Sequence, residues 1–154
     1  MPSVSPQAGK QFRPFLGIVT IVNGSRFCIP LTSNSQNKTK DFDRMKENIT
    51  LRKIRDKDGK ILAALNLNNM IPVREEYITE INLKAEKDDT QQMRQWKKLC
   101  IKELNWCQTN QNEIERLANE LYKMYCSGQT FAKRKICLNF SALEKECQKA
   151  KHFP

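Results

Sequence analysis

The chain has 154 residues, a length typical of a single domain with a core of its own, and we expect one domain over residues 1–154. Lysine and arginine total 27 against 17 acidic residues, so the formal net charge is +10, which favours a polyanionic partner, nucleic acid before an anionic membrane. No apolar run nears the roughly 20 residues that span a bilayer, and the N-terminus has no secretory signal pattern, so we expect a cytoplasmic protein without membrane contact.

The first half of the chain is typical of β-structure. Phe15 to Val22 is apolar and β-branched, Asn23-Gly24 is the pair preferred in type I′ turns, and Phe27 to Leu31 returns, which predicts a hairpin. A polar loop from Asn34 to about Asp41 follows it. The segment from Phe42 to Asn48 is predicted to form one or two helical turns.

A second hairpin is predicted from Thr50–Ile54 and Ile61–Leu65, with a turn at 56–59 between them. Met70 to Val73 contains a proline, which cannot donate to a strand ladder, so we expect an edge strand or the start of one. Tyr77 to Leu83 alternates imperfectly between apolar and polar residues and is a further strand candidate.

From Asp88 onward the apolar period changes to that of a helix. Asp88, Asp89 and Thr90 can each cap a first helix. Its apolar positions are Met93, Trp96, Cys100, Leu104 and Cys107. A second helix follows a break at 108–112 and ends at Gly128. Phe131 to Phe140 fits either a strand or a loop, and Ser141 begins a capping box for a last short helix. These elements predict an α+β fold, a twisted antiparallel sheet packed against about three helices.

The six cysteines do not form a metal-binding pattern, because the chain has no Cys-x-x-Cys pair and one histidine. We expect reduced structural thiols, no metal and no cofactor.

The end of the first hairpin is the best candidate for chemistry. Cutting RNA without metal requires help in removing the ribose 2′-hydroxyl proton, stabilisation of phosphoryl charge and protonation of the leaving oxygen. Thr32 and Ser33 supply hydroxyls, and Lys38 and Lys40 follow within a few residues. Arg52, Lys53 and Arg55 add charge on a predicted strand. The alternative is that Thr-Ser only ends a strand and starts a turn.

Two further groups fit contacts with RNA. Lys133-Arg134-Lys135 either contacts backbone phosphates or is a solvated face. Asn68 and Asn69 either hydrogen-bond bases or form a turn.

The ordered set Arg13-Pro-Phe-Leu-Gly-Ile-Val19, Asn23-Gly24, Ile29-Pro-Leu-Thr-Ser33 and Leu65-Asn-Leu-Asn-Asn-Met-Ile-Pro-Val73 resembles the ToxN/AbiQ family, the endoribonuclease toxins of type III toxin–antitoxin systems. The resemblance extends into the helical half, through the run from Phe131 to Cys147. It implies a twisted, barrel-like sheet related to that of the Kid/MazF toxins and metal-independent cleavage of cellular or phage mRNA to 2′,3′-cyclic phosphate ends. It also implies inhibition by a repetitive pseudoknot RNA in a closed protein–RNA assembly, and a role in phage defence by abortive infection.

The chain departs from this family at two places. The family's Ser is followed by Pro-Lys, and that active-site lysine position is Ser35 here, so either Lys38 or Lys40 replaces the lysine or catalysis is weakened. The family also carries about twenty more residues with a first strand before the Arg-Pro-Phe strand, so either the start is truncated or the sheet lacks that edge. The weakened form would be an RNA-binding protein that keeps the antitoxin RNA.

The resemblance and the residues together give one set of site predictions. Thr32, Ser33, Ser35, Lys38 and Lys40 form the expected catalytic group. The expected RNA contacts are Arg13, Arg26, Arg52, Lys53, Arg55, Asn68, Asn69, Lys133, Arg134 and Lys135.

Overall fold

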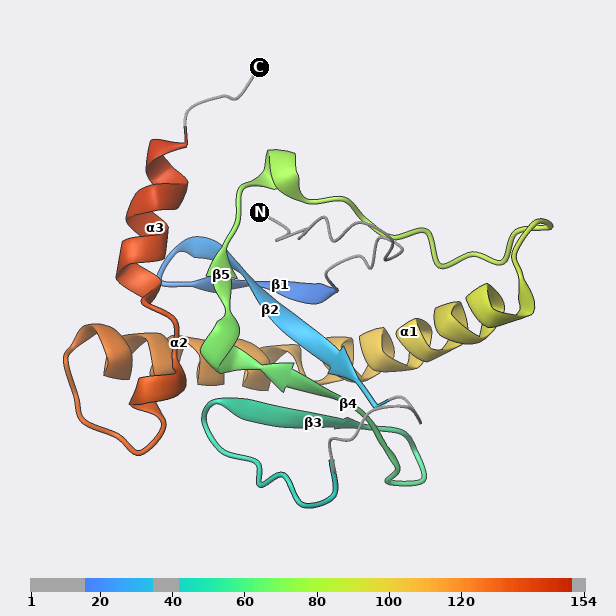
Figure 1. The fold of residues 1–154 in the computed structure, drawn as a ribbon, viewed down its shortest axis with the longest axis horizontal. Coiled ribbons are helices and arrows are strands. Elements are labelled where there is room, and N and C mark those ends of the chain that lie inside the picture. Colours follow the sequence, from blue (N-terminus) through green and yellow to red (C-terminus); the bar gives the residue numbers. More distant parts are fainter. Residues whose placement is uncertain (1–15, 35–41, 151–154) are drawn as a thin grey trace, which may run out of the picture.

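The computed structural model describes residues 16–34 and 42–150. Its five strands come first and its three α-helices last, which confirms the predicted α+β class with a helical C-terminal half (Figure 1). The strands are β1 (Gly17–Val22), β2 (Ser25–Ser33), β3 (Leu51–Arg55), β4 (Ile61–Asn66) and β5 (Ile71–Pro72). The helices are α1 (Gln91–Thr109), α2 (Gln111–Cys126) and α3 (Phe140–Lys149), and short 3-10 turns span Leu67–Asn69, Glu75–Tyr77 and Arg134–Ile136.

The first hairpin forms as predicted. Val22 faces Ser25 across the turn, and the two turn residues both have positive φ, 49° at Asn23 and 76° at Gly24. Positive φ at both central residues defines the type I′ turn, whose twist matches that of the strands. The pair Asn23-Gly24 therefore fixes the register of β1 on β2.

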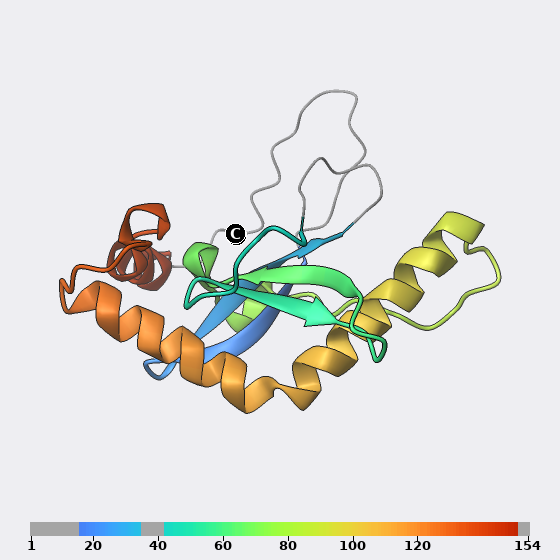
Figure 2. The same ribbon diagram turned by 90° about the horizontal axis from the view of Figure 1, so that it is seen from below.

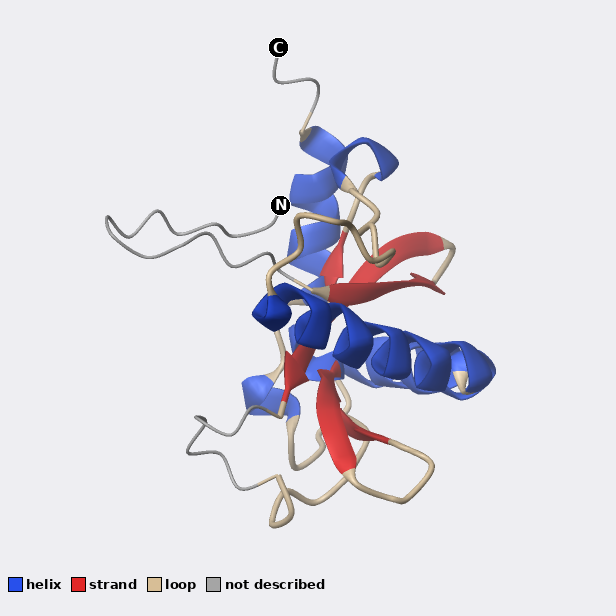
Figure 3. Cartoon of the chain, turned by 90° about the vertical axis from the view of Figure 1, so that its right-hand side faces the viewer, coloured by secondary structure: helices blue, strands red, loops and turns tan. Residues whose placement is uncertain are grey.

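Strand β2 organises the sheet because it pairs along both edges. Its first six residues pair with β1, Phe27 and Cys28 also pair with β5, and its last three residues pair with β4. The described strands run in the order β1-β2-β4-β3, all antiparallel, and the sheet they form is open, not a closed barrel. The strands of the two hairpins run in different directions, as expected for a twisted sheet (Figure 3).

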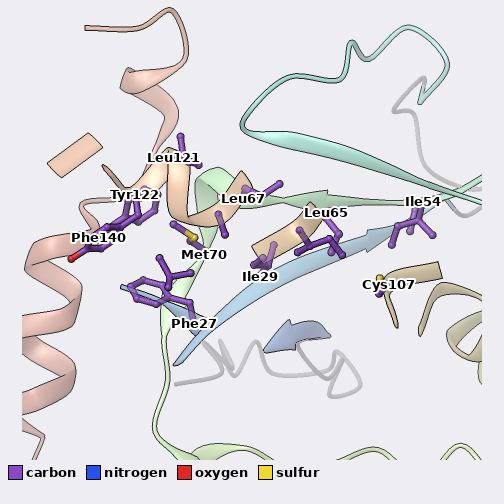
Figure 4. Close-up of a cluster of buried hydrophobic side chains, with 14 of the residues drawn as sticks. Phe27, Ile29, Ile54, Leu65, Leu67, Met70, Cys107, Leu121, Tyr122 and Phe140 are labelled. Atoms are coloured by element: carbon purple, nitrogen blue, oxygen red, sulfur yellow. The ribbon is translucent and has the colours of Figure 1, made fainter. Parts of the chain in front are cut away.

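Helices α1 and α2 lie along one face of the sheet, and α3 lies beyond the end of α2 (Figure 2). The main core forms between the sheet and the helices. It includes Phe27, Leu65, Leu121 and Phe140, each fully buried (Figure 4). Burying such a side chain stabilises the fold by about 1.5–3 kcal/mol. The alternating apolar residues of β2 and the inward faces of the helices thus hold the strand ends in place.

The inward face of α1 differs from the prediction. Met93 and Leu104, expected as core positions, are 44% and 42% exposed. The residues buried instead include Lys97 and Glu103, on the same side of the helix as Cys100 and Cys107. Apolar periodicity missed this face because two charged residues occupy it, each satisfied by a specific polar partner.

Three other local predictions were wrong. Residues 42–44 form a turn and 45–47 are irregular, so the expected helical turns are absent there. Tyr77 to Leu83 is not a strand; an Asx contact, in which the Lys84 amide donates to Asn82 Oδ1, helps to turn the chain there. The last helix is capped by Asn139, which accepts from the Ala142 amide, and not by Ser141.

Two predictions about helix ends were confirmed. Of the three candidate caps, Thr90 is the one that caps α1, by accepting from the Met93 backbone amide, and Gly128, with φ of 75°, follows α2. The strand at Met70–Val73 shrinks to the two residues of β5. All six cysteines are free thiols. None of the helices in residues 16–34 and 42–150 is long and apolar enough to cross a membrane.

Candidate functional site

The two hydroxyl residues at the end of β2 lie on opposite faces of the sheet. Successive side chains of a strand alternate between faces, and the partners of Thr32 and Ser33 agree with this. Ser33 contacts α1, on the helix side, whereas Thr32 contacts Asn66, on the side covered by residues 42–51. Both are half-buried, and the next residue, Asn34, is exposed. A phosphate could reach both hydroxyls only at the end of the strand, where the faces meet.

Ser33 is held from the helix side by a carboxylate. Its Oγ donates to Glu103 Oε1 over 2.9 Å, and Glu103 itself is only 2% exposed. The strand end is fixed independently by Asn34, whose backbone amide donates to the Leu62 carbonyl over 2.7 Å. The backbone of Ser33 is therefore anchored by β4 and its side chain by α1.

Thr32 is held from the other side by an amide. The side chain of Asn66 donates to Thr32 Oγ1 over 2.9 Å. Ala64 of β4 pairs with Thr32 of β2 on one side and with Lys53 of β3 on the other, so the threonine and the lysine share this face two strands apart. Lys53 is 6% exposed, and its ammonium donates to the Asp43 carbonyl over 3.4 Å. This face therefore carries a buried cation, which lies two strands away from Thr32 and is directed at the Asp43 carbonyl.

The other two cations of β3 differ in setting. Arg52 reaches α2, where its guanidinium pairs with Glu113 over 2.5 Å, and its Nε is buried without a hydrogen-bond partner among the described residues. Arg55 is exposed and donates to the Gly59 carbonyl within its own hairpin. Arg55 is thus more accessible to a phosphate than Arg52.

The remaining predicted RNA contacts are spread over the surface. Arg26 pairs with Glu75 over 2.8 Å, and both side chains are well exposed. The Asn68 side chain donates to the Ile136 carbonyl, and this bond ties the turn after β4 to the segment before α3. Asn68 therefore has a structural role. That tie also brings Asn69, which is exposed, near the segment that contains Lys133 and Lys135.

Arg134 contacts the C-terminal end of α2. Its guanidinium donates to the Tyr125 carbonyl over 2.7 Å and lies over the Tyr125 ring. Lys133 and Lys135 on either side are exposed. The three-cation run therefore combines one helix-capping arginine with two accessible lysines.

Four of the predicted residues, Arg13, Ser35, Lys38 and Lys40, lie outside the described residues. The structure thus places Thr32 and Ser33 together at the end of β2, with Lys53 two strands away in register with Thr32, whereas Lys133 and Lys135 lie in the segment between α2 and α3.

Glu103 is the residue that sequence reasoning missed. It stands three residues after Cys100 and four before Cys107, on the face predicted to be apolar, and a charged residue at such a position was the available signal. Burial, and secondarily the charge of Glu103, raises the pKa of the Cys107 thiol to about 12 and that of the Cys100 thiol to about 11. Both thiols are therefore protonated and inert near neutral pH.

A largely apolar groove of about 1100 Å³ opens beside Glu103. Its walls come from β1, β2, residues 71–83 and α1, and include Ile18, Leu31, Ile78 and Leu104. Gly17 lines the groove where a side chain could not fit, because an added Cβ would lie 2.3 Å from Cys28 Sγ and 2.8 Å from the Ile29 carbonyl oxygen. The glycine therefore permits the close contact of β1 with β2.

Comparison with known proteins gives a consistent result. Residues 3–148 match the family described as Toxin ToxN, type III toxin–antitoxin system. The chain is 31% identical over 144 residues to the endoribonuclease ToxN of Bacillus thuringiensis subsp. kurstaki, covering 90% of this chain and 69% of that protein.

Solved structures agree in fold. One, from work on selective inhibition of a type III toxin by a non-coding RNA pseudoknot, superposes with a TM-score of 0.68 at 26% identity, over 94% of this chain and 83% of the other. AbiQ, a lactococcal anti-phage endoribonuclease of a type III system, superposes with a TM-score of 0.67 at 22% identity, over 82% and 72%. The chain belongs to the ToxN family of type III toxin–antitoxin endoribonuclease toxins.

Proposed function

We propose that this chain is a metal-independent endoribonuclease whose active centre lies at the end of β2. The observation that carries the proposal is the anchoring of two adjacent hydroxyls, Thr32 and Ser33, by separate polar partners on the two faces of one strand end. Half-buried hydroxyls held in fixed orientations can position a ribose-phosphate group without having to be reorganised during the reaction.

The proposed reaction is intramolecular transesterification. The ribose 2′-oxygen attacks the adjacent phosphorus as it loses its proton, the bond from phosphorus to the 5′-oxygen breaks, and that oxygen takes up a proton. The products are a 2′,3′-cyclic phosphate and a 5′-hydroxyl. Thr32 and Ser33 orient the reacting groups. Lys38 or Lys40 of the following loop stabilises the phosphoryl charge, with Lys53 of β3 adding positive charge on the Thr32 face.

We further propose that exposed cations hold the RNA chain. Arg55, Lys133 and Lys135 are exposed among the described residues, and the net charge of +10 favours polyanions. The inhibitory partner would be a repetitive pseudoknot RNA, bound in a closed assembly with several copies of the chain. RNA substrates would place the activity in the cytoplasm, and residues 1–154 would act as a single domain.

The test is induced expression of the unmodified chain and of Ser33→Ala in bacteria, with purified proteins assayed on RNA in EDTA. We expect growth arrest and cyclic-phosphate ends from the unmodified chain, and loss of both from the variant. Cleavage at an equal rate by Ser33→Ala would refute the assigned centre.

A second candidate is favoured by one residue. The resemblance to the family implies an active-site lysine at position 35, where this chain has Ser35, and this departure would fit an RNA-binding protein of weakened catalysis. Such a protein would shift RNA in a salt-dependent manner without producing cyclic-phosphate ends. Cleavage gained by Ser35→Lys, with unchanged RNA affinity, would support this second candidate.

A further inference from the structure

Glu103 is an unusual residue for its position. It lies on the inward face of α1 with 2% of its surface exposed, between two buried thiols. Glutamates are almost never fully buried unless they are paired, because an unpaired carboxylate loses its hydration. An apolar residue would suit this face better for stability alone, so the carboxylate needs a specific reason.

The contact between Glu103 and Ser33 is one such reason. Its Oε1 accepts from Ser33 Oγ over 2.9 Å, a contact between residues 70 apart in sequence that joins α1 to the end of β2. The negative charge of Glu103 also raises the thiol pKa values of Cys100 and Cys107, in addition to the larger effect of burial. The hydrogen bond fixes where the single hydroxyl proton of Ser33 points.

The direction of that proton decides what Ser33 can do. A hydroxyl has one proton to donate and two lone pairs to accept with. When the proton is given to a carboxylate, only lone pairs face any third group. Thr32 accepts where Ser33 donates. Its Oγ1 accepts a hydrogen bond from the Asn66 side-chain amide, so its own hydroxyl proton can be donated to another group.

We propose that Glu103 is a positioning residue that makes Ser33 a hydrogen-bond acceptor toward the substrate, while Asn66 leaves Thr32 a donor. The inference rests on the proposed function of this strand end. The matching substrate groups are the ribose 2′-hydroxyl, which can donate to Ser33, and a non-bridging phosphoryl oxygen, which can accept from Thr32. Ser33 thus orients the attacking hydroxyl, and Thr32 the phosphate that it attacks.

Two variants at position 103 separate this role from packing. Glu103→Gln keeps the size of the side chain and an oxygen that accepts from Ser33, whereas Glu103→Met keeps only the approximate size. We expect Glu103→Met to lower kcat on a labelled RNA oligonucleotide at least tenfold with KM changed less than threefold, and Glu103→Gln to stay within about fivefold of the unmodified chain. Glu120→Met is the matched control, since it removes the same charge from an exposed pair with Arg116.

A double-mutant cycle with Ser33→Ala distinguishes a positioning role of Glu103 from a purely structural role. If Glu103 acts through Ser33, Glu103→Met causes no further loss of kcat in the Ser33→Ala background. Losses that multiply, a fully active Glu103→Met, or a folded Glu103→Gln as impaired as Glu103→Met would each overturn the inference. If Glu103→Met does not fold, the Glu103→Gln result decides. Unchanged cleavage by Ser33→Ala alone would instead refute the proposed active centre, and with it this role of Glu103.

Discussion

The guanidinium carbon of Arg134 lies 4.2 Å from the centre of the Tyr125 ring, and the same side chain donates to the Tyr125 carbonyl. Carbonyls in the last turn of a helix have no partner within the helix, and a cation there also complements the helix dipole. Tyr125 in turn packs on Phe140, at 5.0 Å between ring centres, so Arg134 connects the end of α2 to the start of α3.

Replacing Arg134 and its neighbours is expected to have different effects. Arg134→Ala should lower the free energy of unfolding by about 1–3 kcal/mol, because it removes charge-assisted hydrogen bonds to helix-end carbonyls. Lys133→Ala and Lys135→Ala remove the same charge from exposed positions and should leave stability nearly unchanged. Urea unfolding followed by circular dichroism measures all three.

Salt dependence of RNA binding gives the complementary prediction for the two lysines. Removing one lysine that neutralises a phosphate of single-stranded RNA reduces the slope of log affinity against log salt by roughly 0.7. We expect this reduction for Lys133→Ala and for Lys135→Ala in filter-binding titrations across salt concentrations. An unchanged slope in both variants would remove this segment from the proposed RNA-binding surface.

Thr32 provides a sharp test because valine has nearly its shape. Thr32→Val removes the hydroxyl that accepts from Asn66 and should reduce cleavage by roughly 10²-fold, the typical cost of removing one donor to a reacting phosphoryl or acyl group. Thr32→Ser keeps the hydroxyl and should retain most activity. Rates of cleavage under single-turnover conditions, with melting temperatures as the control for folding, distinguish the two. Equal losses in both would point to packing rather than to the hydroxyl.

The predictable and unpredictable parts of this molecule differ in the range of their interactions. The first hairpin could be predicted because Asn23 and Gly24 specify its turn locally, and Thr90 specifies the start of α1 in the same way. The inward face of α1 could not, because the buried Glu103 accepts a hydrogen bond from Ser33, which is 70 residues away in the sequence. The hydroxyl pair Thr32 and Ser33 was visible in the sequence, yet the partners that hold the two side chains on opposite faces appear only in three dimensions.

The same reasoning applies to the predicted RNA contacts. Composition identified the cations but not their surroundings. Arg52 is paired with Glu113 and Arg134 is directed at carbonyls, so long-range contacts decide how accessible each charge is. The strand expected at Tyr77–Leu83 failed for a similar reason, since its apolar residues line the groove beside α1 instead of pairing with a strand.

Phe140 holds α3 against the rest of the core. It is 0% exposed and packs against the rings of Tyr122 and Tyr125. Phe140→Ala should cost about 3–5 kcal/mol of unfolding free energy, the range found when a large aromatic side chain leaves a cavity. Leu138→Ala, at a position 38% exposed, is the control and should cost far less. A small effect of Phe140→Ala would mean that α3 contributes little to the cooperative fold.

The pair Lys97–Asp89 gives stability that depends on pH. The hydrogen bond from the Lys97 ammonium, with a further one from the Glu86 amide, lowers the pKa of Asp89 below its ordinary value of 3.8. A carboxyl whose pKa is depressed on folding stabilises the protein above the unfolded pKa, and this contribution is lost as the pH falls through the lower, folded pKa. Asp89→Asn should therefore be less stable than the unmodified chain at pH 7, and the difference should shrink below about pH 4.

The control for this pair is Glu146→Gln, which breaks an exposed pair with Lys149 in which both side chains are 71% exposed. Exposed pairs contribute little, so we expect no measurable change at either pH. Because the Lys97 ammonium also donates to the Lys84 carbonyl, loss of Asp89 should loosen the segment before α1, and amide hydrogen exchange there should quicken at neutral pH. A stability difference that stays constant from about pH 7 to pH 3 would show that Asp89 acts through its shape and hydrogen bonds and not through its charge.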